Sequence, residues 1–399
     1  MGLRLPAHRG LAPAHPRAPA PHVRRPSGGR GRQGVDRQRG PALPVRPRGT
    51  AAAGRAVLPD QGRGRHADRL QRDPRPGQGL PRDGAAEPDP GERRVSGESN
   101  GALAPLEVEG AVAVVTGGAN GIGKGIVRAL LGRGATVVIA DIEEPVLDAT
   151  VAELAAEFGD GTVSGFRTDV SDEHSVEALA EHVFATHGRC NLLFNNAGVG
   201  SGGGGKAWAN EPNDWKWCFG VNVFGTAHGV ISFVPRMIES GQPGHVVNTS
   251  SGDGGFAPVP MASVYASSKA AVSCLTEALQ HQLVAEADGI GASVFYPSGG
   301  LMDTGLFTSQ RNRPEHLERL RGGTGRASMT FTQMKELLEK AGRDVKVADL
   351  DELGEFVVDC VTERRYVIAR DLEHTVDLLH RRADAIGRFE VPPHHDMGI

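Results

Sequence analysis

The chain has 399 residues, which is enough for one large domain or two ordinary ones. Its net charge of −4 conceals an asymmetry: residues 1–100 hold 20 Arg and 9 acidic residues but no Lys, which gives them +11 and leaves −15 on residues 101–399. A charge of −15 argues against nucleic acid as a partner of the larger part, because phosphates repel it.

Residues 1–100 have a composition that does not support a folded core. They include 15 Pro but no Ile and no aromatic residue, so burial of apolar surface cannot offset the entropy of ordering. We predict a disordered extension. A polyanion-binding tail would mix Lys with Arg, a transit peptide would be richer in Ser, and a secretory signal would need an apolar core. The abundance of Arg, Pro, Gly and Ala favours an out-of-frame upstream region of a GC-rich gene, with the natural start near Val95.

The remaining sequence gives no signal for a metal site, a disulfide framework or a membrane span. The cysteines lack CxxC spacing; they are Cys190, Cys218, Cys274 and Cys360. No wholly apolar run approaches the roughly 18 residues that a membrane span needs. We therefore expect a cytoplasmic protein that binds neither metal nor membrane.

From about residue 108 onward, short apolar stretches alternate with longer helical patterns. The predicted strands are 111–116, 135–140, 162–167, 191–195, 245–248, 292–296 and 366–369. The predicted helices are 122–133, 144–158, 172–187, 213–239, 263–286, 350–363 and 371–386. This alternation favours an α/β fold, a Rossmann-type doubly wound parallel sheet with ligands beyond the carboxyl ends of the strands. We expect a single domain over 108–399.

A glycine-rich turn follows the first predicted strand. Its sequence is Thr116-Gly117-Gly118-Ala119-Asn120-Gly121-Ile122-Gly123. Glycine lets the backbone turn tightly and approach a pyrophosphate, and the helix that follows offers unpaired N–H groups and the positive end of its dipole. Because the turn lies between a strand and a helix, we predict a dinucleotide site that includes Gly117, Asn120, Gly121, Ile122 and Gly123.

Asp141 ends the second predicted strand, about 20 residues after the glycine turn. A carboxylate at this point holds the hydroxyls of the adenosine ribose and repels a 2′-phosphate. No Arg or Lys follows immediately, since Ile142, Glu143 and Glu144 come next. We therefore favour NAD over NADP. The alternative is that Asp141 only caps the next helix.

At this point the sequence resembles the classical short-chain dehydrogenase/reductase family. The glycine turn is similar to that family's TGxxxGxG motif. Further motifs follow in the family's order: Asn195-Asn196-Ala197-Gly198, Asn222-Val223-Phe224-Gly225, Ser250-Ser251 after a strand, and Tyr265-Ala266-Ser267-Ser268-Lys269. The resemblance is close over about 108–300 and looser beyond.

The resemblance implies nicotinamide-dependent oxidation of an alcohol or reduction of a ketone. Its implied catalytic residues are Asn222, Ser251, Tyr265 and Lys269, although Ser250 faces the site instead if the strand ends one residue earlier. The implied cofactor contacts also include Asp169, Val170, Asn196, Ala197, Gly198, Tyr265, Lys269, Pro297 and Thr304. Asp169 fits an ordinary turn equally well, and Asn195 suits a role in holding the sheet together.

The Tyr265–Lys269 pair also makes chemical sense. An alcohol that loses hydride must lose its hydroxyl proton to a base, and a free tyrosine has a pKa of about 10, too high for that role near neutral pH. Lys269 lies four residues from Tyr265, so one helical turn places both on the same face, where an ammonium favours the phenolate. Lowering the pKa by about three units requires roughly 4 kcal/mol.

The segment after the sixth predicted strand departs from the family's Pro-Gly pattern, because Pro297 is followed by Ser298 and two glycines. The long stretch 298–345 is a predicted substrate lid. Two roles are open for its apolar side chains: they line an apolar substrate pocket, or they pack against other parts of the protein. These residues are Leu306, Phe307, Met329, Phe331 and Met334. The glycine-rich loop 200–206 is a predicted mobile rim.

Apolar lid residues suggest a hydrophobic secondary alcohol or ketone. The segments 233–238 and 244–247 resemble bacterial members that act on aryl or alicyclic alcohols, including aryl-propanoid Cα-dehydrogenases, and a steroid-like substrate fits equally well. The alternatives are a nucleotide-binding sensor without turnover and an NADP-dependent ketone reductase. By resemblance we expect a homodimer or homotetramer built on the helices near 213–239 and 263–286.

Overall fold

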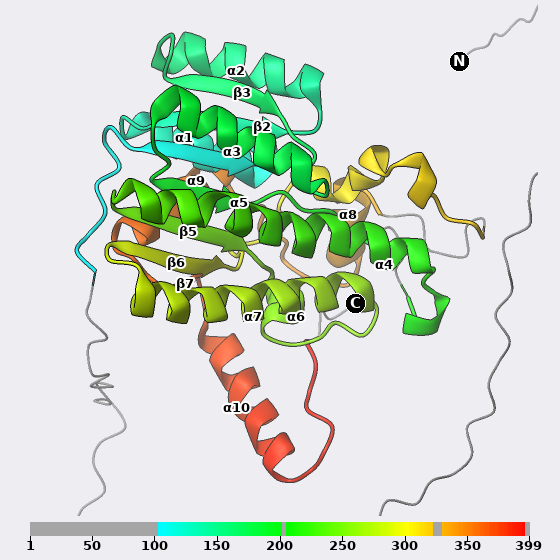
Figure 1. Ribbon diagram of the computed structural model, residues 1–399. Coiled ribbons are helices and arrows are strands. Elements are labelled where there is room, and N and C mark those ends of the chain that lie inside the picture. The colour runs from blue at the N-terminus through cyan, green and yellow to red at the C-terminus, as the bar shows by residue number, and fades with distance from the viewer. Residues whose placement is uncertain (1–102, 202–204, 322–328, 396–399) are drawn as a thin grey trace, which may run out of the picture. The chain divides into compact units, whose positions relative to one another are not determined.

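The computed structural model describes residues 103–201, 205–321 and 329–395, and within them seven parallel strands form one sheet (Figure 1). The strand order is β3-β2-β1-β4-β5-β6-β7. The strands are β1 (Val112–Thr116), β2 (Thr136–Asp141), β3 (Val163–Arg167), β4 (Leu192–Asn195), β5 (Gly244–Thr249), β6 (Ile290–Phe295) and β7 (Val367–Ile368). The order reverses between β1 and β4, which is where doubly wound sheets bind their ligands. The predicted extension over 1–100 and the natural start near Val95 lie outside the described residues.

Helices cover both faces of the sheet, each over its own apolar cluster. One face carries α1 (Gly121–Gly132), α2 (Glu144–Phe158) and α9 (Leu350–Thr362). The other carries α3 (Glu173–His187), α5 (Gly225–Ser240) and α7 (Ser263–Glu286). The five inner strands are almost wholly buried, which explains why most of their residues are apolar, and the parallel sheet covered on both faces confirms the predicted fold class.

α1 and α9 approach so closely that their backbones touch. A Cβ atom on Gly125 would lie 2.1 Å from the carbonyl oxygen of Leu350, and one on Gly354 would lie 2.2 Å from that of Gly125. Glycine at both positions therefore fixes α1, whose N-terminus points at the carboxyl edge of the sheet.

The helix predicted over 213–239 is divided into three parts. α4 (Pro212–Phe219) passes through a single π-helical turn, Gly220–Phe224, into α5. The whole stretch Pro212–Ser240 is long and apolar enough to cross a membrane, but half of its most apolar window is buried inside the fold. Its composition is thus accounted for by packing on the sheet.

After β6 the chain leaves the sheet at Leu301 and returns beside the same point at Val347, and we call the segment between these residues the excursion. Leu301 and Val347 form an isolated parallel bridge, in which Leu301 N donates to Lys346 O at 2.8 Å and Ala348 N to Leu301 O at 2.9 Å. Between them lie two 3-10 helices, η3 (Gly305–Asn312) and η4 (Glu315–Leu317), and α8 (Phe331–Lys340). The base of the excursion is therefore pinned.

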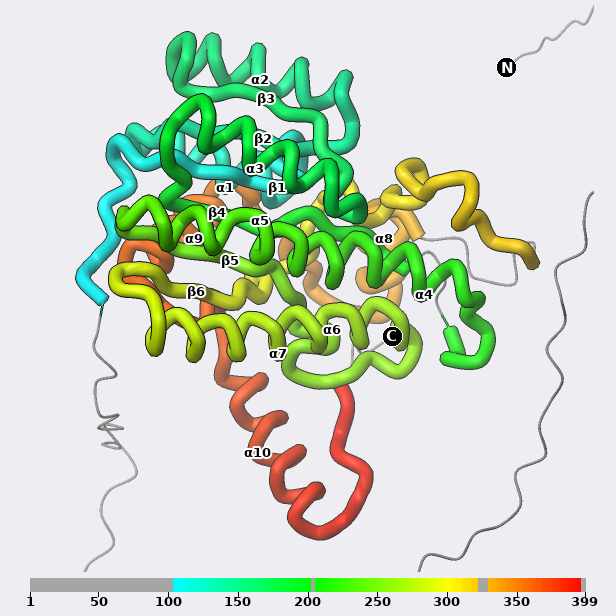
Figure 2. Tube along the Cα trace, in the orientation of Figure 1, coloured from blue at the N-terminus to red at the C-terminus, as the bar shows by residue number. Residues whose placement is uncertain are grey.

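The last helix, α10 (Glu373–Gly387), projects away from the sheet, and the chain after it turns back toward the N-terminal end of α7 (Figure 2). This return is fixed by His395 N, which donates to Pro258 O at 3.0 Å. The turn places residues from the end of the chain beside the carboxyl edge of the sheet.

Candidate active site

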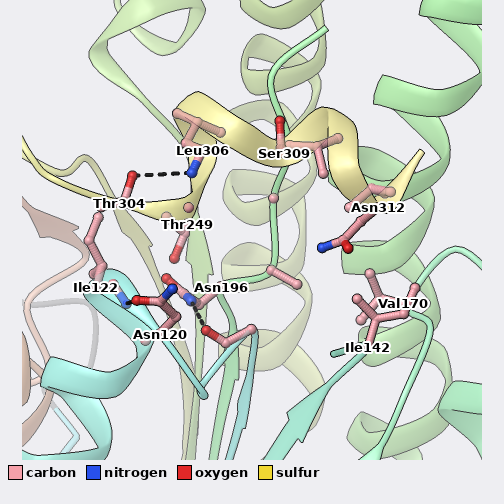
Figure 3. Close-up of a pocket in the computed structure, with 18 of the residues that line it drawn as sticks. Asn120, Ile122, Ile142, Val170, Asn196, Thr249, Thr304, Leu306, Ser309 and Asn312 are labelled. Atoms are coloured by element: carbon pink, nitrogen blue, oxygen red, sulfur yellow. Dashed lines mark hydrogen bonds between the residues drawn. The ribbon is translucent and has the colours of Figure 1, made fainter. Parts of the chain in front are cut away.

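A cavity of about 630 Å³ opens at the carboxyl edge of the sheet, where β1 and β4 diverge. It falls within the range typical of ligand sites. Figure 3 shows η3 lying across it, with Asn120, Ile122 and Thr304 toward one end and Ile142, Val170 and Asn312 toward the other. The wall includes every residue that the sequence assigned to cofactor binding, and it also includes Ser251.

The glycine turn forms one side of the cavity, and its close contacts leave no room for a larger residue at two of its glycines. Gly117 has φ +62°, and a Cβ atom there would lie 2.9 Å from Ala197 Cα. A Cβ atom on Gly123 would lie 2.2 Å from Gly117 O and 2.7 Å from Asn196 Nδ2. Asn120 begins α1, and its side chain accepts a hydrogen bond from Gly121 N. A backbone cradle at a helix N-terminus suits a pyrophosphate, so these residues fit a dinucleotide.

Thr116 and Asn196 tie the loop after β1 to the loop after β4. Thr116 Oγ1 accepts hydrogen bonds from Asn196 N at 3.0 Å and Ala197 N at 3.1 Å. Asn196 Nδ2 donates to Thr116 O at 3.1 Å. Gly198 continues the same loop along the cavity wall. The Asn-Asn-Ala-Gly motif thus holds the cradle against the centre of the sheet.

Asp141 ends β2 and faces the cavity. Its carboxylate accepts hydrogen bonds from Ala119 N at 3.2 Å and Glu143 N at 3.1 Å. Burial raises its pKa above the ordinary value, while these backbone N–H groups act in the opposite direction. The residue at the cap of α2 is Glu143 rather than Asp141. Asp141 therefore shapes the turn and still presents a carboxylate to the cavity.

Asp169 forms a turn and also lies on the cavity wall, while its contact with a cofactor stays a prediction. Its Oδ1 accepts hydrogen bonds from Ser171 N at 2.9 Å and Ser171 Oγ at 2.7 Å, which is an ordinary Asx turn. The same residue and its buried neighbour Val170 lie on the cavity wall. The turn and the wall position coexist.

Tyr265, Lys269 and Ser251 meet at the other end of the cavity. Lys269 Nζ lies 5.8 Å from the centre of the Tyr265 ring and donates to Thr249 O at 2.9 Å. Ser251 lies on the same wall as Tyr265, and its side chain acts to lower the pKa of the Tyr265 phenol. Ser250 also lines the cavity, but its hydroxyl is occupied elsewhere, because its Oγ donates to Lys269 O at 2.8 Å and contacts Ser273 Oγ at 2.8 Å. The structure thus brings Ser251, and not Ser250, to Tyr265.

Burial shifts the pKa values of Tyr265 and Lys269 in directions that their spacing in the sequence does not suggest. Burial raises the pKa of Tyr265 above its ordinary value, and the nearby Asp253 and Cys218 act in the same direction. Burial also lowers the pKa of Lys269 to about 8. Desolvation disfavours the charged forms of both groups, and it opposes the attraction between ammonium and phenolate that their spacing suggests. In the protein alone, burial therefore favours the neutral phenol of Tyr265.

Asn222 lies behind the cavity wall, in the π-helical turn. Its Oδ1 accepts a hydrogen bond from Val199 N at 2.8 Å, and its Nδ2 donates to Val199 O and Ser268 Oγ, both at 3.0 Å. The π-turn rotates this buried side chain toward the loop after β4. The catalytic role that the resemblance implies for Asn222 stays a prediction.

The excursion after β6 roofs the cavity, and only part of its predicted lining reaches it. Leu306 and Phe307 lie on the wall. Phe331 packs edge-on against Phe307 instead, with ring centres 6.0 Å apart. The remaining predicted lining residues, Met329 and Met334, are outside the wall as well. The rim predicted over 200–206 lies partly outside the described residues, and one end is held by Gly200 N, which donates to Ser309 Oγ at 3.1 Å.

Several wall residues were not anticipated from the sequence. The cavity is also lined by Ile142, Glu143, Val199, Trp217, Asp253, Leu301, Met302, Arg311 and Asn312. Asp253 pairs with His395 from the returning chain end, at 2.9 Å between Oδ1 and Nδ1. No local motif marks such contacts, because the partners lie far apart in the sequence.

Asn195 and His245 lie in the core. Asn195 Nδ2 donates to Asn248 Oδ1 at 2.8 Å and so links β4 to β5, as the sequence suggested. His245 Nε2 contacts Ser293 Oγ at 2.6 Å, and burial lowers its pKa to about 3. Both side chains stabilise the sheet from within.

Comparison with known proteins agrees with this geometry. The family model described as short chain dehydrogenase matches residues 111–315. The chain therefore belongs to the short-chain dehydrogenase/reductase family, as its motifs predicted.

Individual relatives cover different parts of the chain. A solved short-chain dehydrogenase/reductase from Burkholderia phymatum in complex with NAD is 35% identical, with a TM-score of 0.65, over 73% of this chain and 99% of that one. The C alpha-dehydrogenase of Sphingobium sp. strain SYK-6 is 38% identical over 205 residues, 51% of this chain and 64% of that protein. Probable oxidoreductase EphD of Mycobacterium tuberculosis is 36% identical over 195 residues, 49% of this chain but 31% of that protein.

Proposed function

We propose that the chain is an NAD-dependent oxidoreductase that transfers hydride between NAD(H) and a hydrophobic secondary alcohol or ketone. The observation that carries this proposal is the meeting of Ser251, Tyr265 and Lys269 on the wall of a cavity whose opposite side is a glycine cradle. Such a cavity holds a dinucleotide and a small substrate side by side. The intact set of polar groups disfavours a sensor without turnover.

The side chains divide the work of alcohol oxidation. Ser251 orients the substrate oxygen toward Tyr265, which takes the hydroxyl proton as the C–H bond breaks. Bound NAD⁺ would accept the hydride and, as a cation, favour the phenolate. Lys269 lies beside the tyrosine ring and, when protonated, favours the same phenolate. Buried polar groups interact more strongly than they would in water. In the reverse direction, Tyr265 returns the proton to the ketone oxygen.

The choice of NAD over NADP is supported by the charge at one end of the cavity. We assign this end, which is lined by Asp141, Glu143 and Arg311, to the adenosine ribose and call it the ribose end. Asp141 lines this end of the cavity, and a 2′-phosphate would meet its negative charge, whereas the charge of Glu143 is paired with Arg311. A ribose hydroxyl, by contrast, can donate to the Asp141 carboxylate. This favours NAD over an NADP-dependent ketone reductase.

A hydrophobic substrate is supported by the wall near the roof. Apolar side chains there come from three separate segments: Val199, Trp217, Leu301, Met302, Leu306 and Phe307. The similarity to a protein named C alpha-dehydrogenase favours an aryl alcohol within this class, beside alicyclic and steroid-like alcohols.

The test is a turnover screen with the full chain. Aryl-propanols, substituted cyclohexanols and hydroxysteroids are incubated with NAD⁺ or NADP⁺, and NADH or NADPH is followed by absorbance. We expect NADH from at least one alcohol class, and NADH formed at least about 100-fold more slowly from the same class with Tyr265→Phe. The proposal fails if no class is oxidised, or if Tyr265→Phe turns over at the wild-type rate. Faster turnover with NADP⁺ would overturn the cofactor choice.

For assembly we propose a homodimer or homotetramer that uses the outer faces of α5 and α7. Large apolar side chains are exposed there, namely Ile231 (68%), Ile238 (43%) and Val284 (52%). Neighbouring exposed apolar residues often mark protein contacts. Light scattering of the full chain tests this: Ile231→Glu should shift the oligomer toward monomer, and a monomeric wild type would refute it.

A further inference from the structure

An ion pair joins the roof of the cavity to the turn after β2. Arg311 Nε, on η3, donates to Glu143 Oε2 at 3.0 Å, and Arg311 Nη2 pairs with Glu143 Oε1. Asn312 Nδ2 donates to the same Oε1 at 2.9 Å. These donors hold the pKa of Glu143 below its ordinary value. The carboxylate therefore occupies two of the three guanidinium nitrogens.

Arg311 is also held by its own helix, independently of Glu143. Its Nη1 donates to Thr308 Oγ1 at 2.8 Å and to Gly305 O at 3.1 Å. η3 is fixed in turn by the contact of Ser309 with Gly200. If the charge of Glu143 were removed, the guanidinium would stay beside the cavity, with Nε and Nη2 available to another acceptor.

The pair lies at the ribose end of the cavity. Glu143 is two residues from Asp141, and both line the wall together with Arg311. In Figure 3, Asn312 lies opposite Ile142 and Val170, at the end away from Thr304. A guanidinium is the side chain best suited to bind a phosphate through two parallel hydrogen bonds. The cavity thus contains a potential phosphate ligand that is already occupied by a carboxylate.

We propose that Glu143 determines cofactor specificity by neutralising Arg311, which would otherwise bind a 2′-phosphate on the adenosine ribose. The proposal rests on the NAD-dependent function above and adds to the role of Asp141. Asp141 repels the phosphate directly, whereas Glu143 withholds the cation that would attract it. Selection against the 2′-phosphate is then shared by two carboxylates with different partners.

The experiment measures binding of nucleotide fragments to the full chain by calorimetry, with no turnover involved. Adenosine 2′,5′-bisphosphate is compared with adenosine 5′-monophosphate. In Glu143→Gln we expect the affinity for the bisphosphate, relative to the monophosphate, to rise about tenfold over wild type at moderate salt. The second variant, Glu143→Gln with Arg311→Ala, should lose this gain.

A matched control is available one residue further on. Glu144→Gln removes the same charge from an exposed side chain that is outside the cavity wall, and should leave the ratio of affinities unchanged. The proposal is overturned if Glu144→Gln gives the same gain, if the gain survives in the double variant, or if Glu143→Gln gives none. Should Glu143→Gln fail to fold, Glu143→Ala serves the same comparison.

These outcomes are separate from those that test the proposed function. A wild-type chain that binds neither fragment would refute the nucleotide site itself, and one that prefers the bisphosphate would refute the choice of NAD. Weak bisphosphate binding in the wild type, with the gain in Glu143→Gln, supports both.

Discussion

The two ends of the cavity handle charge in opposite ways. At the ribose end, charged side chains are partly exposed and paired with each other, and the Arg311 and Glu143 side chains are 37% and 24% exposed. At the Tyr265 end, the charged group beside the tyrosine ring is buried: Lys269 is 4% exposed and donates to a neutral acceptor, Thr249 O. Under our proposal, one end selects a ligand by the sign of its charge, whereas burial at the other end alters proton affinity.

This difference predicts how the two ends respond to change. Interactions between exposed charges are weak and screened by salt, so substitutions there should alter selectivity more than stability. Buried polar groups pay a desolvation cost that depends on their protonation, so substitutions there should alter turnover, stability and pH dependence together.

The largest effect is expected from Tyr265→Phe. Loss of a general base that acts in the transition state lowers turnover by about 10²–10⁴-fold, and affinity for NAD should change little. Steady-state kinetics and nucleotide titration measure the two quantities. The control is Tyr296→Phe, which removes a buried phenol that donates to Ser273 Oγ at 3.1 Å outside the cavity. Equal losses in both variants would contradict a special role for Tyr265.

Asp214 joins α4 to the segment after η3 through a buried ion-pair cluster. Its fully buried carboxylate contacts Arg313 Nη1 and Arg319 Nη2, each at 2.9 Å. Asp214→Asn leaves two largely buried guanidinium groups short of a counter-charge, and should lower the free energy of unfolding by about 3–5 kcal/mol. Denaturant unfolding measures this, with the exposed Asp148→Asn as the control. A loss below about 1 kcal/mol would show that water reaches the cluster.

The features predictable from the sequence are those that depend on neighbours along the chain. The glycine cradle, Asp141, and the Tyr265–Lys269 spacing each lie within one strand, turn or helix, where period and spacing reveal them. The alternation of apolar segments likewise predicted all seven strands of the described sheet, and each predicted end lies within two residues of the observed one.

The features that the sequence did not reveal are contacts between distant segments. Glu143 and Arg311 are 168 positions apart, and Asp253 and His395 are 142 apart, so no local pattern connects them. The π-helical turn at Asn222 depends on packing against the loop after β4, and helical periodicity alone predicts an unbroken helix there. The pKa of Tyr265 depends on burial, which a spacing argument leaves out.

Gly123→Ala tests the cradle between the two ends. The added Cβ atom would meet Gly117 O at 2.2 Å, so the turn must open and its N–H groups must move away from the pyrophosphate position. We expect affinity for NADH to fall by about 100-fold, or about 2.7 kcal/mol. Gly132→Ala at the other end of α1 is the matched control, because the nearest atom to its Cβ would be Phe158 Cε1 at 3.9 Å. Equal affinity in both variants would show that the turn is not the binding element.

Lys269→Met tests whether desolvation governs the Tyr265 end. Burial lowers the pKa of Lys269 from 10.5 to about 8, so between these values the unfolded chain holds more protons and wild-type stability rises with pH. The buried ammonium costs roughly 3 kcal/mol below pH 8, partly offset by its hydrogen bond to Thr249, so the variant should be more stable at pH 7 by about 2 kcal/mol. That advantage should vanish toward pH 10.5. The exposed Lys340→Met should show no such trend, and a pH-independent difference for Lys269→Met would refute the argument.

The smallest effect is expected from Arg311→Ala, at the charged end. Its ion pair with Glu143 is partly exposed, so the free energy of unfolding should change by less than about 1 kcal/mol, and still less at high salt. The same variant should bind adenosine 2′,5′-bisphosphate no better than wild type. It lacks the Arg311 guanidinium that would bind the 2′-phosphate, and it leaves the Glu143 carboxylate unpaired. Chemical denaturation at two salt concentrations measures the first quantity and calorimetry the second. A loss comparable to that of Asp214→Asn would mean that the ribose end is held by buried charge after all, and the contrast between the two ends would no longer stand.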